Sequence, residues 1–155
     1  MKLYCGIDPG AVSGAWGVID HNGKYQSCGD MLHNDKHILS RAVWAEMCQA
    51  VDRQDLEIIV ESVHSMPRQG VASTFKFGMA YGAAISLAER FNCPWHLVTP
   101  KKWKKLLGLD SDKDNSLELA RSLWPNAPLS RKKDNGRAEA LLLAEYLRRE
   151  QLEYD

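Results

Sequence analysis

The chain opens with Lys2-Leu-Tyr-Cys-Gly-Ile-Asp8-Pro-Gly10, a mostly apolar run that ends on one carboxylate. The apolar part has the pattern of a buried strand, and Pro9-Gly10 predicts a turn directly after it. A second apolar run starts after Gly14, so the two runs predict hairpin strands joined by a loop of about five residues. A charge at the end of a core strand is costly unless a cation or a hydrogen-bond network compensates it. From this stretch alone, Asp8 either caps the Pro-Gly turn or binds a metal ion, and the two interpretations fit equally well.

Length and composition set the frame for the rest of the chain. Its 155 residues predict one domain, 1–155, with 45% hydrophobic and 26% charged residues, as in soluble globular proteins. No apolar run approaches the ~20 residues that cross a membrane, and the N-terminus has no signal-peptide pattern. We therefore expect a cytoplasmic protein with no membrane partner. The scattered cysteines, without metal-site spacing, predict free thiols.

The remaining pattern predicts an α/β fold with one mixed five-stranded sheet flanked by helices. An Asn22-Gly23 turn predicts a third hairpin strand over 23–31, antiparallel to the second. The β-branched run 56–61 predicts a buried strand parallel to the first, and 94–99 a fifth strand parallel to it. Apolar spacing and Pro or Gly punctuation predict helices over 35–53, 74–90, a short segment from Pro100 to Gly108, 113–124 and 137–149.

The helix expected over 74–90 is rich in small residues, among them Gly78 and Gly82. A glycine inside a helix costs about 1 kcal/mol, and close approach of another backbone is the usual reason for it. That backbone belongs either to the sheet or to a second subunit.

Carboxylates recur where ligands gather in α/β folds. Glu61 ends a strand as Asp8 does, and acids beyond neighbouring strand ends can meet. Glu139 stands between alanines on an otherwise apolar helix face, where a carboxylate needs a partner. Asp134, five residues earlier, is either a helix cap or a further ligand. Such an all-oxygen set suits Mg²⁺ or Mn²⁺, and two such ions about 4 Å apart would activate water and clamp a scissile phosphate.

Basic residues concentrate in the last third of the chain although the net charge is zero. Between Lys101 and Arg137 there are ten Lys or Arg and five Asp or Glu. The densest clusters are Lys101-Lys-Trp-Lys-Lys105 and Arg131-Lys-Lys133. One such cluster is usually a solvated face, but two beside a candidate metal site predict a phosphate-binding rim.

Together, four stretches resemble the RuvC-type Holliday-junction resolvases of the RNase H-like superfamily, most of all their short phage and prophage versions. They are Gly6-Ile-Asp8-Pro-Gly10 with Ser13-Gly14 and Gly17-Val18-Ile19, then Ile58-Ile-Val-Glu61, then Ser73-Thr-Phe-Lys-Phe-Gly78-Met-Ala-Tyr-Gly82, and last Gly136-Arg-Ala-Glu139-Ala-Leu-Leu-Leu-Ala144. The run Val98-Thr-Pro-Lys-Lys-Trp-Lys-Lys105 is similar to the basic segment of the same family. The resemblance spans the chain to about Leu147 in the right order.

The resemblance implies a two-metal nuclease that cuts branched DNA as a homodimer, in a bacterial or phage-infected cell. It places the catalytic and metal-binding acids at Asp8, Glu61 and Glu139. The family's remaining acid falls on Gly136, and Asp134 is its substitute two residues upstream. The dimer helix falls on 74–90. DNA contacts are expected from His64, unless it is a solvated loop residue, and from Arg68, Lys76, Lys101, Lys102, Lys104, Lys105, Arg131, Lys132, Lys133 and Arg137.

Three other functions compete with a junction-cutting nuclease. Sugar kinases and actin-type ATPases share the opening motif but need two such domains and a second phosphate loop, for which 155 residues leave no room. A YqgF-type nuclease acting on RNA is a closer alternative, against which the glycine-rich helix and the Lys/Trp segment weigh. The glycine at position 136 keeps open a junction-binding protein that has lost catalysis.

Overall fold

The computed structural model describes residues 1–10, 12–51 and 55–154. Along the chain come β1 (Leu3–Asp8), β2 (Ala15–Asp20), β3 (Tyr25–Asp30), α1 (Ser40–Ala50), β4 (Leu56–Glu61), α2 (Val71–Arg90), β5 (Trp95–Val98), α3 (Pro100–Leu106), α4 (Lys113–Leu123), a 3-10 turn at Lys132–Asp134, and α5 (Asn135–Tyr154). Within these ranges no helix is both long and apolar enough to cross a membrane. The four cysteines are free thiols, as expected.

The strands form one mixed sheet in the order β3-β2-β1-β4-β5. β1 pairs antiparallel with β2, and β2 with β3, whereas β1, β4 and β5 run parallel. The predicted fold class is confirmed, with the three hairpin strands on one side and the two parallel strands on the other.

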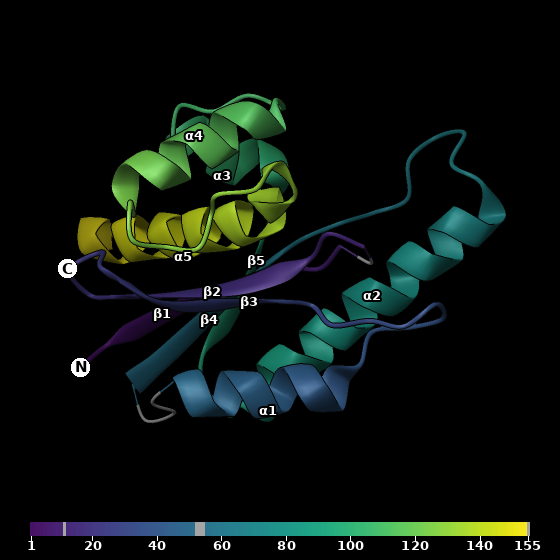
Figure 1. The fold of residues 1–155 in the computed structure, drawn as a ribbon, viewed down its shortest axis with the longest axis horizontal. Coiled ribbons are helices and arrows are strands. Elements are labelled where there is room, and N and C mark those ends of the chain that lie inside the picture. Colours follow the sequence, from purple (N-terminus) through teal and green to yellow (C-terminus); the bar gives the residue numbers. More distant parts are fainter. Residues whose placement is uncertain (11, 52–54, 155) are drawn as a thin grey trace.

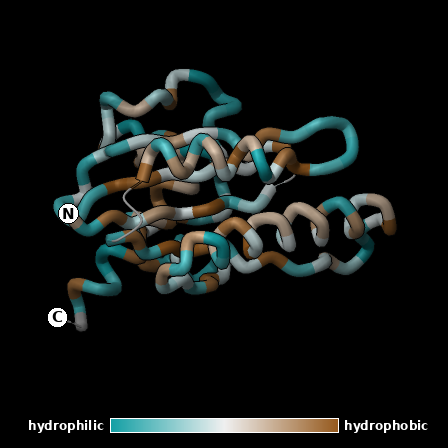
Figure 2. The backbone as a smooth tube through the Cα atoms, turned by 90° about the horizontal axis from the view of Figure 1, so that it is seen from below, coloured by the Kyte–Doolittle hydropathy of each residue, from teal (hydrophilic) through white to brown (hydrophobic). Residues whose placement is uncertain are grey.

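Helices cover both faces of the sheet (Figure 1). One layer holds α3, α4 and α5, and the other holds α1 and α2. Because side chains alternate along a strand, β1 sends Cys5 and Ile7 into the core under α1 and α2 and Tyr4 into the core under α5. Figure 2 shows the hydrophobic residues gathered on the central strands and the hydrophilic ones on the connections.

Two glycines on neighbouring strands let α5 lie close against the sheet. Gly6 and Gly17 are cross-strand partners. A Cβ at Gly6 would overlap the carbonyl oxygen of Ala140, and one at Gly17 would come within 2.8 Å of the Leu141 side chain. The glycine in the Gly-Ile-Asp opening therefore has a packing function, since it sets how near α5 comes to β1.

Several helix ends differ from those predicted. The first helix begins at Ser40 instead of residue 35, because the Asn34 side chain accepts hydrogen bonds from the backbone of Lys36 and His37 and holds a turn there. Its expected last residues, 52–53, lie outside the described residues. α2 begins at Val71, three residues before the predicted start at 74, and α5 runs from Asn135 to Tyr154, longer at both ends than the predicted 137–149.

The small residues of α2 do not all pack on the sheet. Ala80 and Ala84 are buried in the core, but nothing described lies within 4 Å of a Cβ built on Gly78 or Gly82. Sheet packing is therefore the wrong explanation for these two glycines.

Candidate active site

Three of the predicted acids meet at one edge of the sheet. Asp8 and Glu61 end the parallel strands β1 and β4, each directly after the paired residues Ile7 and Val60. Side chains two residues apart on a strand point to the same face of the sheet. Gly6 on β1 and Ile59 on β4 face α5, so Asp8 and Glu61 point toward α5 as well. Glu139 approaches from the N-terminal part of α5, near enough for its charge to raise the pKa of both Asp8 and Glu61.

Burial and mutual repulsion set the electrostatics of this acid cluster. Glu61 and Glu139 are 8% and 5% exposed, and Asp8 is partly buried. Burial raises the pKa of Asp8 well above its usual range, and the charges of Glu61 and Glu139 raise it further. Burial also raises the pKa of Glu61, and a hydrogen bond from Trp103 opposes that rise. These shifts show that the folded chain carries an unfavourable concentration of negative charge here.

The donor chemistry of the cluster fits a hard divalent cation. Oε1 of Glu139 is buried and has no hydrogen-bond partner in the part of the chain that the structure describes. Oδ1 of Asp8 accepts a 3.3 Å bond from the Gly10 backbone, which is the expected turn cap and leaves Oδ2 available for a ligand. All the available groups are carboxylate oxygens, as Mg²⁺ and Mn²⁺ prefer. Within the described ranges, however, no three His, Cys, Asp or Glu side chains stand close enough to hold one ion jointly.

Two consecutive residues of α3 contact this cluster. The Trp103 indole donates from Nε1 to Oε2 of Glu61 at 2.7 Å. Lys104 Nζ lies 3.8 Å from Oε1 of Glu139, and its side chain is only 15% exposed. Lys104 was expected to contact DNA, but its ammonium lies against the acids. Trp103 and Lys113, whose charge lowers the pKa of Asp8 and Glu61, were not predicted as site residues.

Asp134 is held by Arg131. Its carboxylate is 2% exposed and accepts from the backbone N–H of Arg131 at 2.9 Å and from its guanidinium at 2.7 Å. These contacts lower the pKa of Asp134. Asp134 is the third residue of the 3-10 turn Lys132–Asp134 and bonds back to Arg131, the N-cap residue of that turn, so it is not itself the predicted helix N-cap. Both of its carboxylate oxygens are committed to Arg131.

Packing explains why position 136 is a glycine. A Cβ there would overlap the carbonyl oxygen of Ser13 in the loop between β1 and β2. An aspartate at this position is incompatible with the observed path of that loop, so the family's remaining acid is excluded by packing.

The remaining basic residues fall into two groups. Arg137 bonds Asp30 at 2.8 and 3.0 Å, and Arg131 bonds Asp134, so both guanidinium groups are engaged within the chain. The other group is exposed to solvent and comprises His64, Arg68, Lys76, Lys101, Lys102, Lys105, Lys132 and Lys133.

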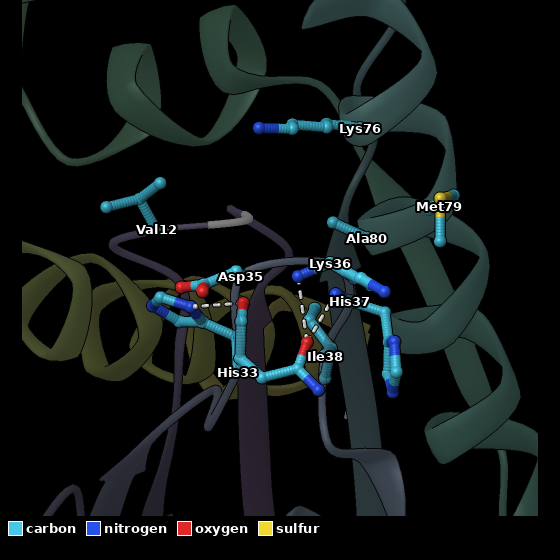
Figure 3. A pocket seen from close by; sticks show the side chains of 10 residues that line it. Val12, His33, Asp35, Lys36, His37, Ile38, Lys76, Met79 and Ala80 are labelled. Atoms are coloured by element: carbon cyan, nitrogen blue, oxygen red, sulfur yellow. Dashed lines mark hydrogen bonds between the residues drawn. The ribbon is translucent and has the colours of Figure 1, made fainter. Parts of the chain in front are cut away.

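A hollow of about 200 Å³ lies between α2, the loop before α1 and the loop after β1 (Figure 3). Lys76 reaches across it from α2 toward Val12, while His33, Lys36 and His37 line the opposite side. Asp35 also stands on that side and offsets part of the positive charge.

The sheet order, its mixture of parallel and antiparallel strands and its two helix layers define an RNase H-like fold. Among solved structures, the chain is similar to Thermus thermophilus RuvC in complex with a Holliday junction substrate, with a TM-score of 0.71 and 19% identity over 97% of this chain and 96% of that one. A second Thermus thermophilus RuvC structure matches with a TM-score of 0.70 and 19% identity over 98% and 97% of the two chains. No protein-family model matches the sequence, and no curated protein does.

Proposed function

We propose that this protein is a metal-dependent endonuclease that cuts four-way or branched DNA junctions by symmetric phosphodiester hydrolysis. The observation that carries the proposal is the meeting of Asp8, Glu61 and Glu139 at the carboxyl edge of β1 and β4, in a fold shared with RuvC. A structural protein gains nothing from placing Glu61 and Glu139 where their charges raise the pKa of Asp8, whereas a metal site requires clustered acids.

The acids would hold two Mg²⁺ or Mn²⁺ ions. Such ions supply the Lewis acidity that activates water and neutralises charge on a scissile phosphate. Asp8 and Glu61 would hold them from fixed strand ends, and Glu139 would use its buried Oε1. The rotatable side chain of Glu139 can close the gap to a shared ion, because a bound cation offsets the repulsion among the carboxylates. Asp134 would stabilise the start of α5 through Arg131 rather than bind metal.

Exposed lysines on α3 would hold the DNA backbone beside the acids. Lys101, Lys102 and Lys105 surround Lys104 on this short helix and are exposed. Lys132 and Lys133 precede α5, which carries Glu139. Lysines at such a rim neutralise phosphates and release counterions without reading base sequence.

A symmetric dimer through α2 would present two such sites to one junction. Beyond the sheet, the N-terminal half of α2 exposes large apolar side chains, with Val71 89%, Phe75 69% and Phe77 41% accessible (Figure 1). Gly78 and Gly82 leave space for a second backbone there. A second copy of the chain would cover this surface, and two-fold symmetry would pair nicks on opposing strands.

A cleavage assay tests the proposal directly. A synthetic four-way junction, the matching linear duplex and a single-stranded RNA are incubated with Mg²⁺, Mn²⁺ or EDTA. We expect metal-dependent paired nicks in the junction alone. Asp8→Asn or Glu61→Gln should lower the cutting rate by roughly 10³-fold, because each removes a metal ligand, while junction binding persists. Cutting by either variant at the wild-type rate would exclude the site.

Other outcomes select the alternatives. Junction binding without cutting in either metal would identify a binding protein that has lost catalysis, with Gly136 marking the missing ligand. Cutting of RNA in preference to the junction would keep the fold and the acids but assign a YqgF-type function.

A further inference from the structure

Trp103 is a large side chain in the core that is hydrogen-bonded to a candidate metal ligand. It is 0% exposed and packs in the core with Val98, Leu117 and Leu142. Close packing fixes the rotamer of such a side chain, and the indole has a single donor, Nε1–H. The 2.7 Å bond from Nε1 to Oε2 of Glu61 therefore has a fixed direction.

This bond constrains how Glu61 can present its carboxylate. Oε2 accepts the indole hydrogen bond. Among the residues that the structure describes, no hydrogen bond or ion pair engages Oε1, which can bind a cation. A flexible glutamate loses conformational entropy when it binds an ion, and an orienting donor removes part of that cost beforehand. Hydrogen-bonding partners of metal ligands typically contribute about 10–100-fold to metal affinity.

A second core tryptophan, Trp124, also donates an indole hydrogen bond, but to a backbone oxygen and not to one of the three acids. Trp124 is 3% exposed, belongs to the same core and donates from Nε1 to the backbone oxygen of Gly23 at 2.8 Å. Loss of either indole N–H removes one hydrogen bond made by a buried tryptophan of the same core. Only the loss at Trp103 releases Glu61.

We propose that Trp103 is a positioning residue for the metal site. Its indole N–H orients Glu61 so that Oε1 faces the divalent cation. The inference rests on the proposed function, because it takes Glu61 to be a metal ligand.

The test measures Mn²⁺ binding by the electron paramagnetic resonance signal of the free ion. It compares wild-type protein with Trp103→Phe, Trp124→Phe and Glu61→Gln. We expect Trp103→Phe to raise the Mn²⁺ dissociation constant about tenfold or more, with Trp124→Phe within about twofold of wild type. Thermal unfolding should show similar losses of stability in the two tryptophan variants. Equal Mn²⁺ affinity in Trp103→Phe and wild type, or equal weakening by both tryptophan variants, would overturn the inference.

A measurement on the wild-type chain covers the case in which Trp103→Phe does not fold. The indole N–H signals are followed by nuclear magnetic resonance during a Mg²⁺ titration. We expect the Trp103 signal to shift as Mg²⁺ saturates and the Trp124 signal to stay in place; an unshifted Trp103 signal in the metal-bound protein would overturn the inference. If wild-type protein binds neither ion, the metal-dependent function fails as well, whereas normal binding by a folded Trp103→Phe variant overturns the role of Trp103 alone.

Discussion

The two longest helices, α2 and α5, each have 20 residues, yet they are packed in opposite ways. α5 lies against the sheet, and the glycines that permit its approach, Gly6 and Gly17, are on the strands below it. α2 carries its glycines itself, and nothing described meets Gly78 or Gly82. The comparison separates two uses of small residues. On the α5 side they bring Glu139 close to Asp8 and Glu61, and on the α2 side they leave a surface that the described residues of the chain do not fill.

The largest effect should come from replacing one glycine by alanine on each side: Gly6 on β1, which α5 contacts, and Gly78 on α2. Gly6→Ala would force Cβ into the Ala140 carbonyl oxygen and should lower the free energy of unfolding by about 3 kcal/mol or more. Gly78→Ala meets no neighbour and should raise it by about 0.5–1 kcal/mol, because alanine is the better helix former. Urea unfolding at concentrations where the chain is monomeric measures both. Similar losses in the two variants would show that α2 is packed as tightly as α5.

Placing a negative charge on each helix in turn tests whether α2, and not α5, mediates self-association of the chain. Phe75→Glu places a carboxylate on the exposed apolar surface of α2 and should weaken self-association about tenfold or more. Leu152→Glu makes the same change on α5, where Leu152 is 58% exposed, and should leave self-association unchanged. Sedimentation velocity across a concentration series reports the dimer dissociation constant. A wild-type protein that stays monomeric, or equal weakening by both variants, would contradict a dimer through α2.

Much of the α5 side could be predicted from local sequence patterns. Alternating and continuous apolar runs predicted the strands, and the two strands that end in acids predicted Asp8 and Glu61 at one edge. Glu139 was found because a charge between alanines on an apolar helix face requires a partner. Each of these signals lies within a segment of about ten residues, in which the spacing of hydrophobic residues and the side-chain types are enough to predict the element.

The remaining features depend on contacts between distant segments. The bond from Trp103 to Glu61 joins residues 42 apart, and a tryptophan between lysines gives no local sign that it is buried. The overlap of a residue-136 side chain with Ser13 depends on the path of a loop more than a hundred residues earlier. Asp134 was open to two interpretations because a cap and a ligand use the same side chain, and the bonds from Arg131 that engage it instead depend on the fold of the turn before α5.

The smallest effect concerns the cluster of acids on the α5 side of the sheet. Asp8→Asn should raise the free energy of unfolding of the metal-free protein at pH 7, by on the order of 1 kcal/mol, because active-site acids are kept at a cost in stability. The pKa of Asp8 is raised in the folded state by burial and by the neighbouring acids. The folded state thus binds more protons than the unfolded state between the unfolded and folded pKa values, and wild-type stability falls as pH rises through that window. The gain from Asp8→Asn should accordingly be full above the folded pKa and vanish below about pH 3, where Asp8 is protonated in both states.

Asp30 provides the control of opposite sign on the same side of the sheet. Its hydrogen bonds from Arg137 lower the pKa of Asp30, so its stabilising contribution is present above the unfolded pKa and is lost as pH falls through the folded one. Asp30→Asn should therefore destabilise the protein at pH 7, and the loss should shrink in acid. Urea unfolding of both variants with EDTA from pH 3 to pH 8 should give two curves that diverge from wild type in opposite directions as pH rises. A loss of stability from Asp8→Asn at pH 7, or a gain that does not depend on pH, would mean that the acids at this edge are already neutralised within the chain and need no cation.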